Sequence, residues 1–521
     1  MSTFILAHDI GTTGDKATLF RDDGTLVAST FGGYPTRYPR SGWAEQDPDD
    51  YWEAFCRATR ELTASARCNP RDIGVVSFSG QMMAALPLDR GGRPLRPSII
   101  WADQRASREI EELAARVSAD RVYDLTGHPL SAAYSLAKIM WIRRNEPEVF
   151  TRTSHFIQAK DFLVLKLTGR ICSDYSDASG TQLLDIRNLR WSNEILDAAG
   201  VSALLLPELL ESTTIAGKIT PEAATASGLA QGTPVAVGGG DGACATCGAG
   251  VVSEGDAYIC LGTSTWMATA SRAPLIDKAR RTVTFSHFTR GLYFPCGVMQ
   301  AGGGSLTWFR DTLADTEKAA AGAAGIDVHE ILNREAAAVP PGSEGLLFLP
   351  YLMGERSPWW SAAARACFIG LSMRHGKNHM LRAVMEGVAY NMRLIAEVFA
   401  ELGMRYESLR MIGGAARNSA WRQIFADVLE KPVDLLNFVE EATSVGAAIA
   451  GGVGIGLFPT IESAARMVRV VGRTEPQPAR FPVYRGYYPC FKRSYQQLEP
   501  IFAMLAECQQ RGDSPVEHQE P

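Results

Sequence analysis

Asp241 is the residue in this sequence whose surroundings best suit acid–base chemistry. It follows the apolar run at residues 235–237 and stands between Gly240 and Gly242. The sequence therefore predicts a carboxylate at the end of a buried strand, the edge at which open α/β sheets bind ligands. A carboxylate there can accept a hydroxyl proton as the oxygen attacks phosphorus, and such general-base help is typically worth about 10²–10⁴-fold in rate. Asp-Gly pairs also form plain turns, and the pattern alone leaves that alternative open.

A second carboxylate, Asp9, follows the apolar run at residues 4–7. Mg²⁺ prefers oxygen ligands and keeps several of its waters, so Asp9 could hold this ion directly or through water. Lys16 lies at the far end of the same loop and could balance the charge of a phosphate. The alternatives are an aspartate that caps the turn and a lysine that is simply solvated.

Three glycine-containing turns follow apolar strands and carry hydroxyl or amide side chains. Glycine lets backbone N–H groups approach an oxyanion closely, and threonine hydroxyls add donors. One such turn is usually a plain hairpin, but three in one chain favour a nucleotide site. The Walker pattern is absent, so an ATP site would be of another kind. The turns are Asp9-Ile-Gly-Thr-Thr-Gly-Asp-Lys16, Leu261-Gly-Thr-Ser-Thr265 and Gly413-Gly-Ala-Ala-Arg-Asn418.

Two other patterns are weaker. Cys244 and Cys247 have the spacing of a metal or redox pair, but no second Cys/His pair is near and their neighbours are small and apolar, which favours two core cysteines on a helix. The turn from Gly248 to Gly250 partly matches the dinucleotide-binding fingerprint. It lacks the third glycine and follows an expected helix rather than a strand.

The totals exclude several classes of function. Lys and Arg number 52 and Asp and Glu 57, for a net charge of −5, so no broad positive field is available to bind nucleic acid. The chain shows no signal peptide and no apolar run of 18 residues, which predicts no membrane span. The ten cysteines are scattered over 521 residues. A cytoplasmic protein with reduced thiols is expected.

The surrounding patterns predict an α/β architecture that is duplicated. Apolar runs at residues 4–7 and 16–20, with the turn signal Asp22-Asp23-Gly24, indicate strand, loop, strand and hairpin. The second half also opens with a strand and a glycine- and threonine-rich turn. We expect an N-terminal lobe over residues 1–247, a C-terminal lobe over 248–508 and a disordered tail over 509–521.

In this order, the motifs resemble the FGGY family of carbohydrate kinases, and its xylulokinase-like branch most. The resemblance covers roughly residues 4–500. It includes the Asp9 loop, Gly238-Gly-Gly-Asp-Gly242 and the two later turns, together with Ser79-Gly-Gln-Met82, Trp101-Ala-Asp-Gln-Arg105, Ala159-Lys-Asp-Phe-Leu163, Ser173-Asp-Tyr-Ser-Asp-Ala-Ser-Gly-Thr181 and Phe348-Leu-Pro-Tyr-Leu-Met-Gly-Glu-Arg-Ser-Pro358.

The resemblance implies two actin-like, ribonuclease-H-like α/β lobes with a cleft between them. It also implies transfer of the γ-phosphoryl group of ATP, with Mg²⁺, to a sugar or polyol hydroxyl, and a homodimer. By position, Asp241 looks like the family's catalytic base, and Asp9 and Asp241 would support the metal. The implied nucleotide contacts are Thr12, Thr13 and Lys16 near the β- and γ-phosphates, Gly262, Thr263, Gly302, Gly303 and Gly304 around the phosphate turn, and Gly413, Gly414 and Asn418 near adenosine.

The implied sugar end contains one departure from the family pattern. Its residues are Gln81, Met82, Met83, Trp101, Asp103 and Asp241. Xylulokinases usually have histidine where this chain has Met83, and a thioether is only a weak acceptor. This departure argues against D-xylulose itself and leaves the phosphoryl chemistry untouched. The resemblance implies a small sugar as acceptor, a ketopentose such as xylulose, with ribulose, other ketoses and alditols as alternatives. A non-catalytic actin-like ATP-binding switch and a nicotinamide-dependent oxidoreductase are the rival classes.

Overall fold

The computed structural model describes residues 3–512, which form two compact units. Unit 1 contains residues up to Asp256 together with 269–295 and 440–469, and unit 2 contains 257–268, 296–439 and 470 onward. The units are interleaved along the chain, whereas the sequence analysis placed a single boundary after Cys247. Of the tail expected at 509–521, residues 509–512 belong to the last helix and the rest lie outside the described residues.

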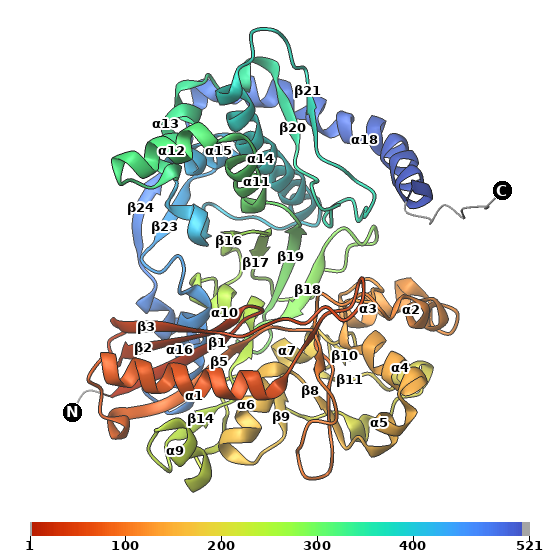
Figure 1. Cartoon of the computed structure of the whole chain (residues 1–521), viewed down its shortest axis with the longest axis vertical. Coiled ribbons are helices and arrows are strands. Elements are labelled where there is room, and N and C mark those ends of the chain that lie inside the picture. Colours follow the sequence, from red (N-terminus) through yellow and green to blue (C-terminus); the bar gives the residue numbers. More distant parts are fainter. Residues whose placement is uncertain (1–2, 513–521) are drawn as a thin grey trace, which may run out of the picture. The chain divides into compact units, whose positions relative to one another are not determined.

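Unit 1 is built on a mixed sheet with the strand order β13-β14-β5-β1-β2-β3, and β15 also pairs with β5 (Figure 1). Its elements are β1 (Phe4–Ile10), β2 (Gly14–Arg21), β3 (Leu26–Gly33), β4 (Glu45–Gln46), α1 (Pro48–Ser65), β5 (Ile73–Gly80), β6 (Leu86–Leu88), β7 (Ser98–Ile99), α2 (Ser107–Ala114), α3 (Ala119–Thr126), α4 (Ser135–Asn145), α5 (Pro147–Arg152), β8 (His155–Ile157), α6 (Ala159–Thr168), β9 (Cys172–Asp174), α7 (Tyr175–Ser179), β10 (Leu184–Asp185), β11 (Arg190–Trp191), α8 (Asn193–Ala199), β12 (Glu208–Leu210), β13 (Ile215–Lys218), α9 (Pro221–Ser227), β14 (Pro234–Ala236), β15 (Gly239–Gly240), α10 (Asp241–Gly248), β18 (Val283–Ser286), α16 (Ala442–Gly454) and α17 (Ile461–Ala464).

Unit 2 contains a sheet with the order β19-β17-β16-β22-β23-β24. Strands β17 and β19 are assigned here because most of each lies in unit 2. The elements are β16 (Ala257–Leu261), β17 (Thr265–Thr269), β19 (Tyr293–Met299), α11 (Gly303–Leu313), α12 (Asp315–Ala324), α13 (Val328–Ala338), β20 (Leu347–Leu349), β21 (Cys367–Ile369), α14 (Lys377–Glu401), β22 (Leu409–Ile412), α15 (Ser419–Leu429), β23 (Val433–Leu436), β24 (Val470–Thr474) and α18 (Phe481–Gly512).

The two sheets repeat one topology, which confirms the predicted duplication. In unit 1 the strands β1, β5 and β14 run parallel and β13 pairs antiparallel to β14. In unit 2 the strands β16, β22 and β23 run parallel and β24 pairs antiparallel to β23. The predicted hairpin is also present: Gly24 takes a positive φ of 84°, and the Arg21 amide donates to the Thr25 carbonyl at 2.9 Å.

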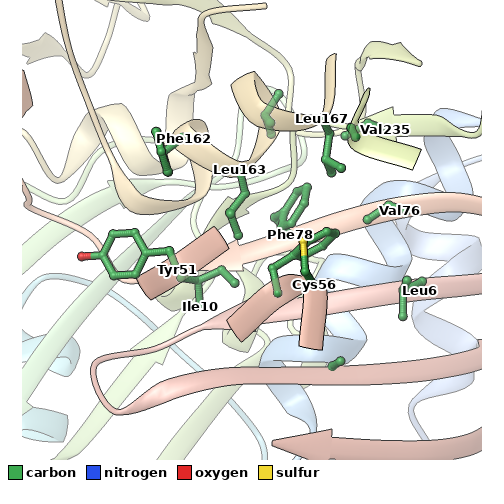
Figure 2. Packing of buried hydrophobic residues seen from close by; sticks show 14 of the residues in the cluster. Leu6, Ile10, Tyr51, Cys56, Val76, Phe78, Phe162, Leu163, Leu167 and Val235 are labelled. Carbon is green, nitrogen blue, oxygen red and sulfur yellow. The ribbon is translucent and has the colours of Figure 1, made fainter. Parts of the chain in front are cut away.

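The two faces of the unit 1 sheet pack against different helices. Leu6 and Ile10 of β1 join a buried cluster with residues of α1 and α6, including Phe55 and Phe162 (Figure 2). The alternate residues of the strand point to the opposite face, where α16 packs against β1 and β5. Asp9 therefore points away from the apolar cluster and toward α16.

Helix α1 shows why the first face is stable. Asp47 caps it by accepting a hydrogen bond from the Asp49 amide at 3.2 Å, and Pro48 occupies its first turn. Tyr51, Phe55 and Leu62 are buried at helical spacing, which gives the helix one apolar face for the sheet.

None of the helices within residues 3–512 is both long enough and apolar enough to cross a membrane.

The contact between α10 and α16 gives a stability prediction. A Cβ added at Gly446 of α16 would lie 2.0 Å from the Cys244 carbonyl oxygen of α10, so the two backbones leave no room for a methyl group. We expect Gly446→Ala to lower the melting temperature, since overpacking typically costs about 1–3 kcal/mol. Gly322→Ala is the matched control, because nothing lies within 4 Å of that position. Equal melting temperatures for the two variants, measured by calorimetry, would contradict this packing.

Candidate active site

The ends of three parallel strands bring the candidate residues of unit 1 together. Asp9 of β1 pairs with Ser79 of β5, and Gly239 of β15 pairs with the same Ser79 from the other side. Asp241 follows two residues later as the first residue of α10. The sequence prediction that Asp241 stands at the carboxyl end of a strand is confirmed, and Asp9 lies at the same edge.

Asp9 is held by two hydroxyl groups. Ser79 Oγ donates to Asp9 Oδ1 at 2.7 Å, and Thr443 Oγ1 of α16 donates to Oδ2 at 2.6 Å. Burial raises the pKa of Asp9 above its ordinary value, although both hydrogen bonds act in the opposite direction. The two hydrogen bonds thus fix the orientation of the carboxylate.

Asp241 is a partly buried carboxylate with few partners. Its Oδ1 accepts a hydrogen bond from the Gly242 amide at 2.7 Å. Burial, and then the nearby charge of Asp9, raises the pKa of Asp241 to about 7. A carboxylate with this pKa can accept a proton near neutral pH, since the best catalytic pKa lies near the working pH.

Buried polar side chains stabilise the loop that follows Asp9. The Gly11 amide donates to the Gly14 carbonyl at 2.9 Å, which closes the tight turn. Gln46 Nε2 donates to the Thr12 carbonyl at 2.6 Å, and Gln81 Nε2 donates to the Gly11 carbonyl at 3.2 Å. Gln81 is 2% exposed, so the structure places it as a support for the loop, and direct contact with a sugar stays a prediction.

Thr13 and Lys16 occupy the outer side of the same loop and strand. Thr13 is exposed, as a phosphate contact requires. Lys16 Nζ donates to the Glu440 carbonyl at 3.0 Å and lies 3.5 Å from Glu441 Oε1. The predicted role of Lys16 as a phosphate counter-charge would require it to exchange this partly exposed ion pair for the ligand.

Met82 and Met83 follow β5, and Met82 lies beside the glycines that flank Asp241. A Cβ added at Gly240 would lie 2.7 Å from Met82 Sδ, so this thioether covers the residue that precedes Asp241. Met83 has a positive φ of 68°, a conformation that is rare for non-glycine residues and often found at functional sites. The sugar contacts of both methionines stay predictions.

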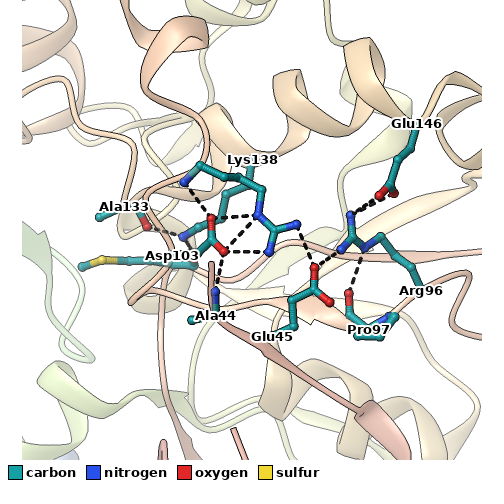
Figure 3. Close-up of polar contacts among 10 residues, drawn as sticks. Ala44, Glu45, Arg96, Pro97, Asp103, Ala133, Lys138 and Glu146 are labelled. Carbon is teal, nitrogen blue, oxygen red and sulfur yellow. Dashed lines mark hydrogen bonds and ion pairs between the residues drawn. The ribbon is translucent and has the colours of Figure 1, made fainter. Parts of the chain in front are cut away.

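Trp101 and Asp103 differ in their exposure to solvent and in their partners. Trp101 is 36% exposed, and its Nε1 donates to Thr12 Oγ1 at 2.8 Å, which links the tryptophan to the Asp9 loop. Asp103 is fully buried: its Oδ2 accepts from the Ala44 amide at 2.6 Å, and both oxygens accept from Arg105 (Figure 3). The structure gives Asp103 a supporting position, so of the two only Trp101 offers a surface to a sugar.

A buried lysine supports the Met83 turn. Lys138 Nζ of α4 donates to the Met83 carbonyl at 2.7 Å and also to the Ala133 carbonyl (Figure 3). Burial lowers the pKa of Lys138 to about 7, although the charge of Asp103 acts in the opposite direction. The hydrogen bond from Lys138 thus stabilises the positive-φ conformation of Met83.

In unit 2, the predicted phosphate turns lie against one another. The Gly303 amide donates to the Gly262 carbonyl at 2.8 Å, and the Gly304 amide donates to the Thr263 carbonyl at 2.9 Å. A Cβ added at Gly302 would lie 1.8 Å from Thr265 Oγ1. The turn after β16 and the start of α11 therefore need glycine to approach this closely.

The turn that begins at Gly413 packs against the end of β16 in unit 2. Gly413 has a positive φ of 90°, and a Cβ there would lie 2.6 Å from the Leu261 carbonyl oxygen. Gly414 has open space around its Cβ position. Asn418 caps α15 by accepting a hydrogen bond from the Trp421 amide at 3.0 Å. The segments around Gly262, Gly303 and Gly413 therefore lie against one another in unit 2. The adenosine contact of Asn418 stays a prediction.

The cysteine pair has the structural role that the sequence analysis favoured. Cys244 and Cys247 are buried on α10, and burial raises the pKa of both thiols. Within residues 3–512, no group of three or more His, Cys, Asp or Glu side chains is arranged to hold a metal ion. Gly248 ends α10, so no strand precedes the partial dinucleotide fingerprint.

Neither of the two hydroxyl groups that donate hydrogen bonds to Asp9 was predicted from the sequence. Ser79 belongs to a quoted motif and directly ends an apolar strand, so its position gave a usable signal. Thr443 gave none, because it lies 434 residues away from Asp9 and reaches it through the return of the chain to unit 1.

The comparisons with known proteins agree on one family. Residues 4–248 match the N-terminal domain, and residues 257–455 the C-terminal domain, of the FGGY family of carbohydrate kinases. The chain is 32% identical over 503 residues to a xylulose kinase of Bacillus subtilis, covering 96% of this chain and 98% of that protein. It is equally 32% identical over 515 residues to a gluconokinase of the same organism, covering 98% and 99%. The crystal structure of xylulose kinase from Rhodospirillum rubrum superposes with a TM-score of 0.87 at 31% identity, covering 96% of this chain and 100% of that one.

The raised pKa of Asp241 predicts a pH-dependent cost in stability. Because its folded-state pKa of about 7 exceeds the ordinary value of 3.8, ionisation disfavours the folded state increasingly as the pH rises from about 4 to 7. We expect Asp241→Asn to raise the melting temperature, and the gain to be larger at pH 8.5 than at pH 5.5. Thermal unfolding at the two pH values measures this difference. A gain in melting temperature that is equal or larger at pH 5.5 would show that the folded protein does not raise the pKa of the Asp241 carboxyl group.

Proposed function

Because the chain belongs to the FGGY family of carbohydrate kinases, it is an ATP-dependent phosphotransferase with an alcohol group as acceptor, and we propose that Asp241 is its general base. The observation that supports this most directly is the place of Asp241 at the strand edge beside Asp9, with a pKa of about 7. In this role the carboxylate accepts the proton of the sugar hydroxyl as that oxygen attacks the γ-phosphorus.

We propose a ketopentose such as xylulose as the acceptor. Xylulose kinases stand among the relatives that match nearly the whole chain. Gluconate is the second candidate, because a gluconokinase matches at the same 32% identity. Met83 in place of the usual histidine argues for a contact with the sugar that is less polar, so ribulose, other ketoses and alditols also belong in the test. Met82, Met83 and Trp101 are the proposed sugar contacts.

The proposed nucleotide contacts fall in both units. In unit 1 they are Thr12, Thr13 and Lys16, for the β- and γ-phosphates. In unit 2 they are Gly262, Thr263, Gly302, Gly303, Gly304, Gly413, Gly414 and Asn418. The close backbone packing of the unit 2 turns and the open space beside Gly414 support this proposal, because glycine lets a phosphate approach the backbone of such a turn closely.

The carboxylates of Asp9 and Asp241 fit Mg²⁺. This ion is usually bound in proteins by one or two carboxylates together with waters and substrate phosphates, and it needs no cluster of three or more protein ligands. Both side chains offer oxygen atoms only, and the two hydroxyl donors fix Asp9 in one orientation. When bound, Mg²⁺ neutralises charge on the phosphate oxygens. A homodimer and a cytoplasmic location remain predictions.

An acceptor panel tests the function. ADP release is measured with Mg·ATP and, in turn, D-xylulose, D-ribulose, D-gluconate, erythritol and glycerol. We expect one acceptor to stimulate ADP release strongly, with xylulose or gluconate the best. A flat response across the panel would instead favour a non-catalytic ATP-binding switch.

The Asp241→Asn variant then tests the role of the base with the best acceptor. Sugar-dependent ADP formation should fall by about 10²–10⁴-fold, the usual contribution of a general base. Binding of ATP should be unchanged, as measured by calorimetric titration. Asp311→Asn, which changes a half-exposed carboxylate on α11, is the matched control and should keep full activity. Near wild-type turnover by Asp241→Asn would overturn the assignment.

A further inference from the structure

A cluster of buried charges lies next to the glycine segment that leads to Asp241. Lys160 Nζ lies 2.7 Å from Asp161 Oδ1, 3.1 Å from Asp174 Oδ1 and 3.4 Å from Asp177 Oδ2. All four side chains are at most 1% exposed. Buried charges at this density are costly unless they are paired and hydrogen-bonded. The nucleotide and sugar contacts proposed above use none of the four.

Asp174 is the centre of the hydrogen bonding in this cluster. Its Oδ2 accepts from the Ser176 amide at 2.9 Å, from Ser176 Oγ at 2.5 Å and from Ser212 Oγ at 2.7 Å. Lys160 neutralises the other oxygen of the same carboxylate. The positions of the two serines are therefore set by one buried, ion-paired group.

The two serines in turn hold both ends of the glycine segment 238–240. Ser176 Oγ accepts a hydrogen bond from the Gly240 amide at 3.1 Å, and the Ser212 carbonyl accepts one from the Gly238 amide at 3.0 Å. Gly240 directly precedes Asp241. The Gly239–Gly240 peptide, which lies one residue before Asp241, is thus oriented by the hydroxyl of Ser176.

Lys160 also packs beneath the strand ends themselves. A Cβ added at Gly80 would lie 2.8 Å from the Cβ of Lys160, so the lysine stem lies against the end of β5. Gly80 pairs with Gly240 on one side and with Ile10 on the other. The lysine therefore combines a steric contact with the sheet edge and an ionic contact with Asp174.

We propose that Ser176, held by Asp174 and Lys160, is a positioning residue that fixes the backbone at Gly240 and thereby the direction of the Asp241 carboxylate. The inference rests on the proposed role of Asp241 as the base. Its physical reason is that a general base works only within hydrogen-bond reach of the proton it accepts. A misplacement of about 1 Å can cost on the order of 10²-fold in rate.

The test compares three serine variants with the best acceptor of the panel. Ser176→Ala removes the acceptor of the Gly240 amide, and we expect kcat to fall between about tenfold and 10²-fold with the KM for ATP unchanged. Ser212→Ala removes a donor to the same Asp174 oxygen but keeps the Gly240 contact, so its loss should be smaller. Ser227→Ala, in which a buried serine of α9 loses its bond to the Ala223 carbonyl and the bond it accepts from the Leu229 amide, should keep wild-type kcat.

Hydrogen exchange gives a readout that does not depend on activity. The peptide containing Gly240 should exchange faster in Ser176→Ala than in wild type, and at the wild-type rate in Ser227→Ala. Ser176→Cys keeps the side-chain size but is a weak acceptor, so it should show the same two effects if Ser176→Ala does not fold.

The outcomes separate the two proposals. An active wild type in which Ser176→Ala and Ser176→Cys match Ser227→Ala in kcat, or leave exchange at Gly240 unchanged, would overturn this inference alone. A fall in kcat accompanied by an equal rise in the KM for ATP would also overturn it, because it would indicate a general structural defect. A wild type that forms no ADP with any acceptor would overturn the proposed function and this inference together.

Discussion

The functional edge of unit 1 depends on the placement of two carboxylates at the ends of neighbouring parallel strands. Asp9 and Gly239 both pair with Ser79, so the register of the sheet sets the distance between Asp9 and the start of α10. Burial, and then the nearby charge of Asp9, disfavours the ionised form of Asp241, which is why its pKa departs from that of an ordinary aspartate. The surroundings that destabilise the ionised form also give Asp241 the pKa that its proposed role as a base near neutral pH requires.

Surrounding residues restrict the orientation of the Asp9 carboxylate and of the backbone near Asp241. Hydroxyls of Ser79 and Thr443 donate hydrogen bonds to Asp9, and the Ser176 hydroxyl accepts one from the Gly239–Gly240 peptide. Glycines at 446 and 413 let backbones approach where no side chain fits. In unit 2 glycines likewise bring three turns together: Gly303 and Gly413 approach backbone atoms of a neighbouring segment, and Gly302 approaches the Thr265 side chain. Repetition of one sheet topology in both units explains why both present turns at strand ends.

Much of this was predictable from local patterns. The apolar runs and the Asp-Gly turn signals predicted β1, β2 and the strand edge at Asp241, because burial and turn chemistry act over a few residues. Roles that depend on long-range contacts were not predictable. Asp103 and Gln81 have polar side chains suited to a sugar, yet packing turns them toward Arg105 and the Gly11 carbonyl. Thr443 belongs to unit 1 only because the chain returns there after β23, which no local pattern indicates.

The pKa of the Asp241 carboxyl group is the property on which its proposed role as a base depends most directly. Its titration can be followed by carbon NMR of protein labelled at the aspartate side chains, with Asp241→Asn used to assign the signal. We expect a pKa of about 7 in the wild type, and a lower value, still above the ordinary 3.8 because burial remains, when Asp9→Asn removes the neighbouring charge. A pKa near 3.8 in the wild type, or one that Asp9→Asn leaves unchanged, would contradict the account.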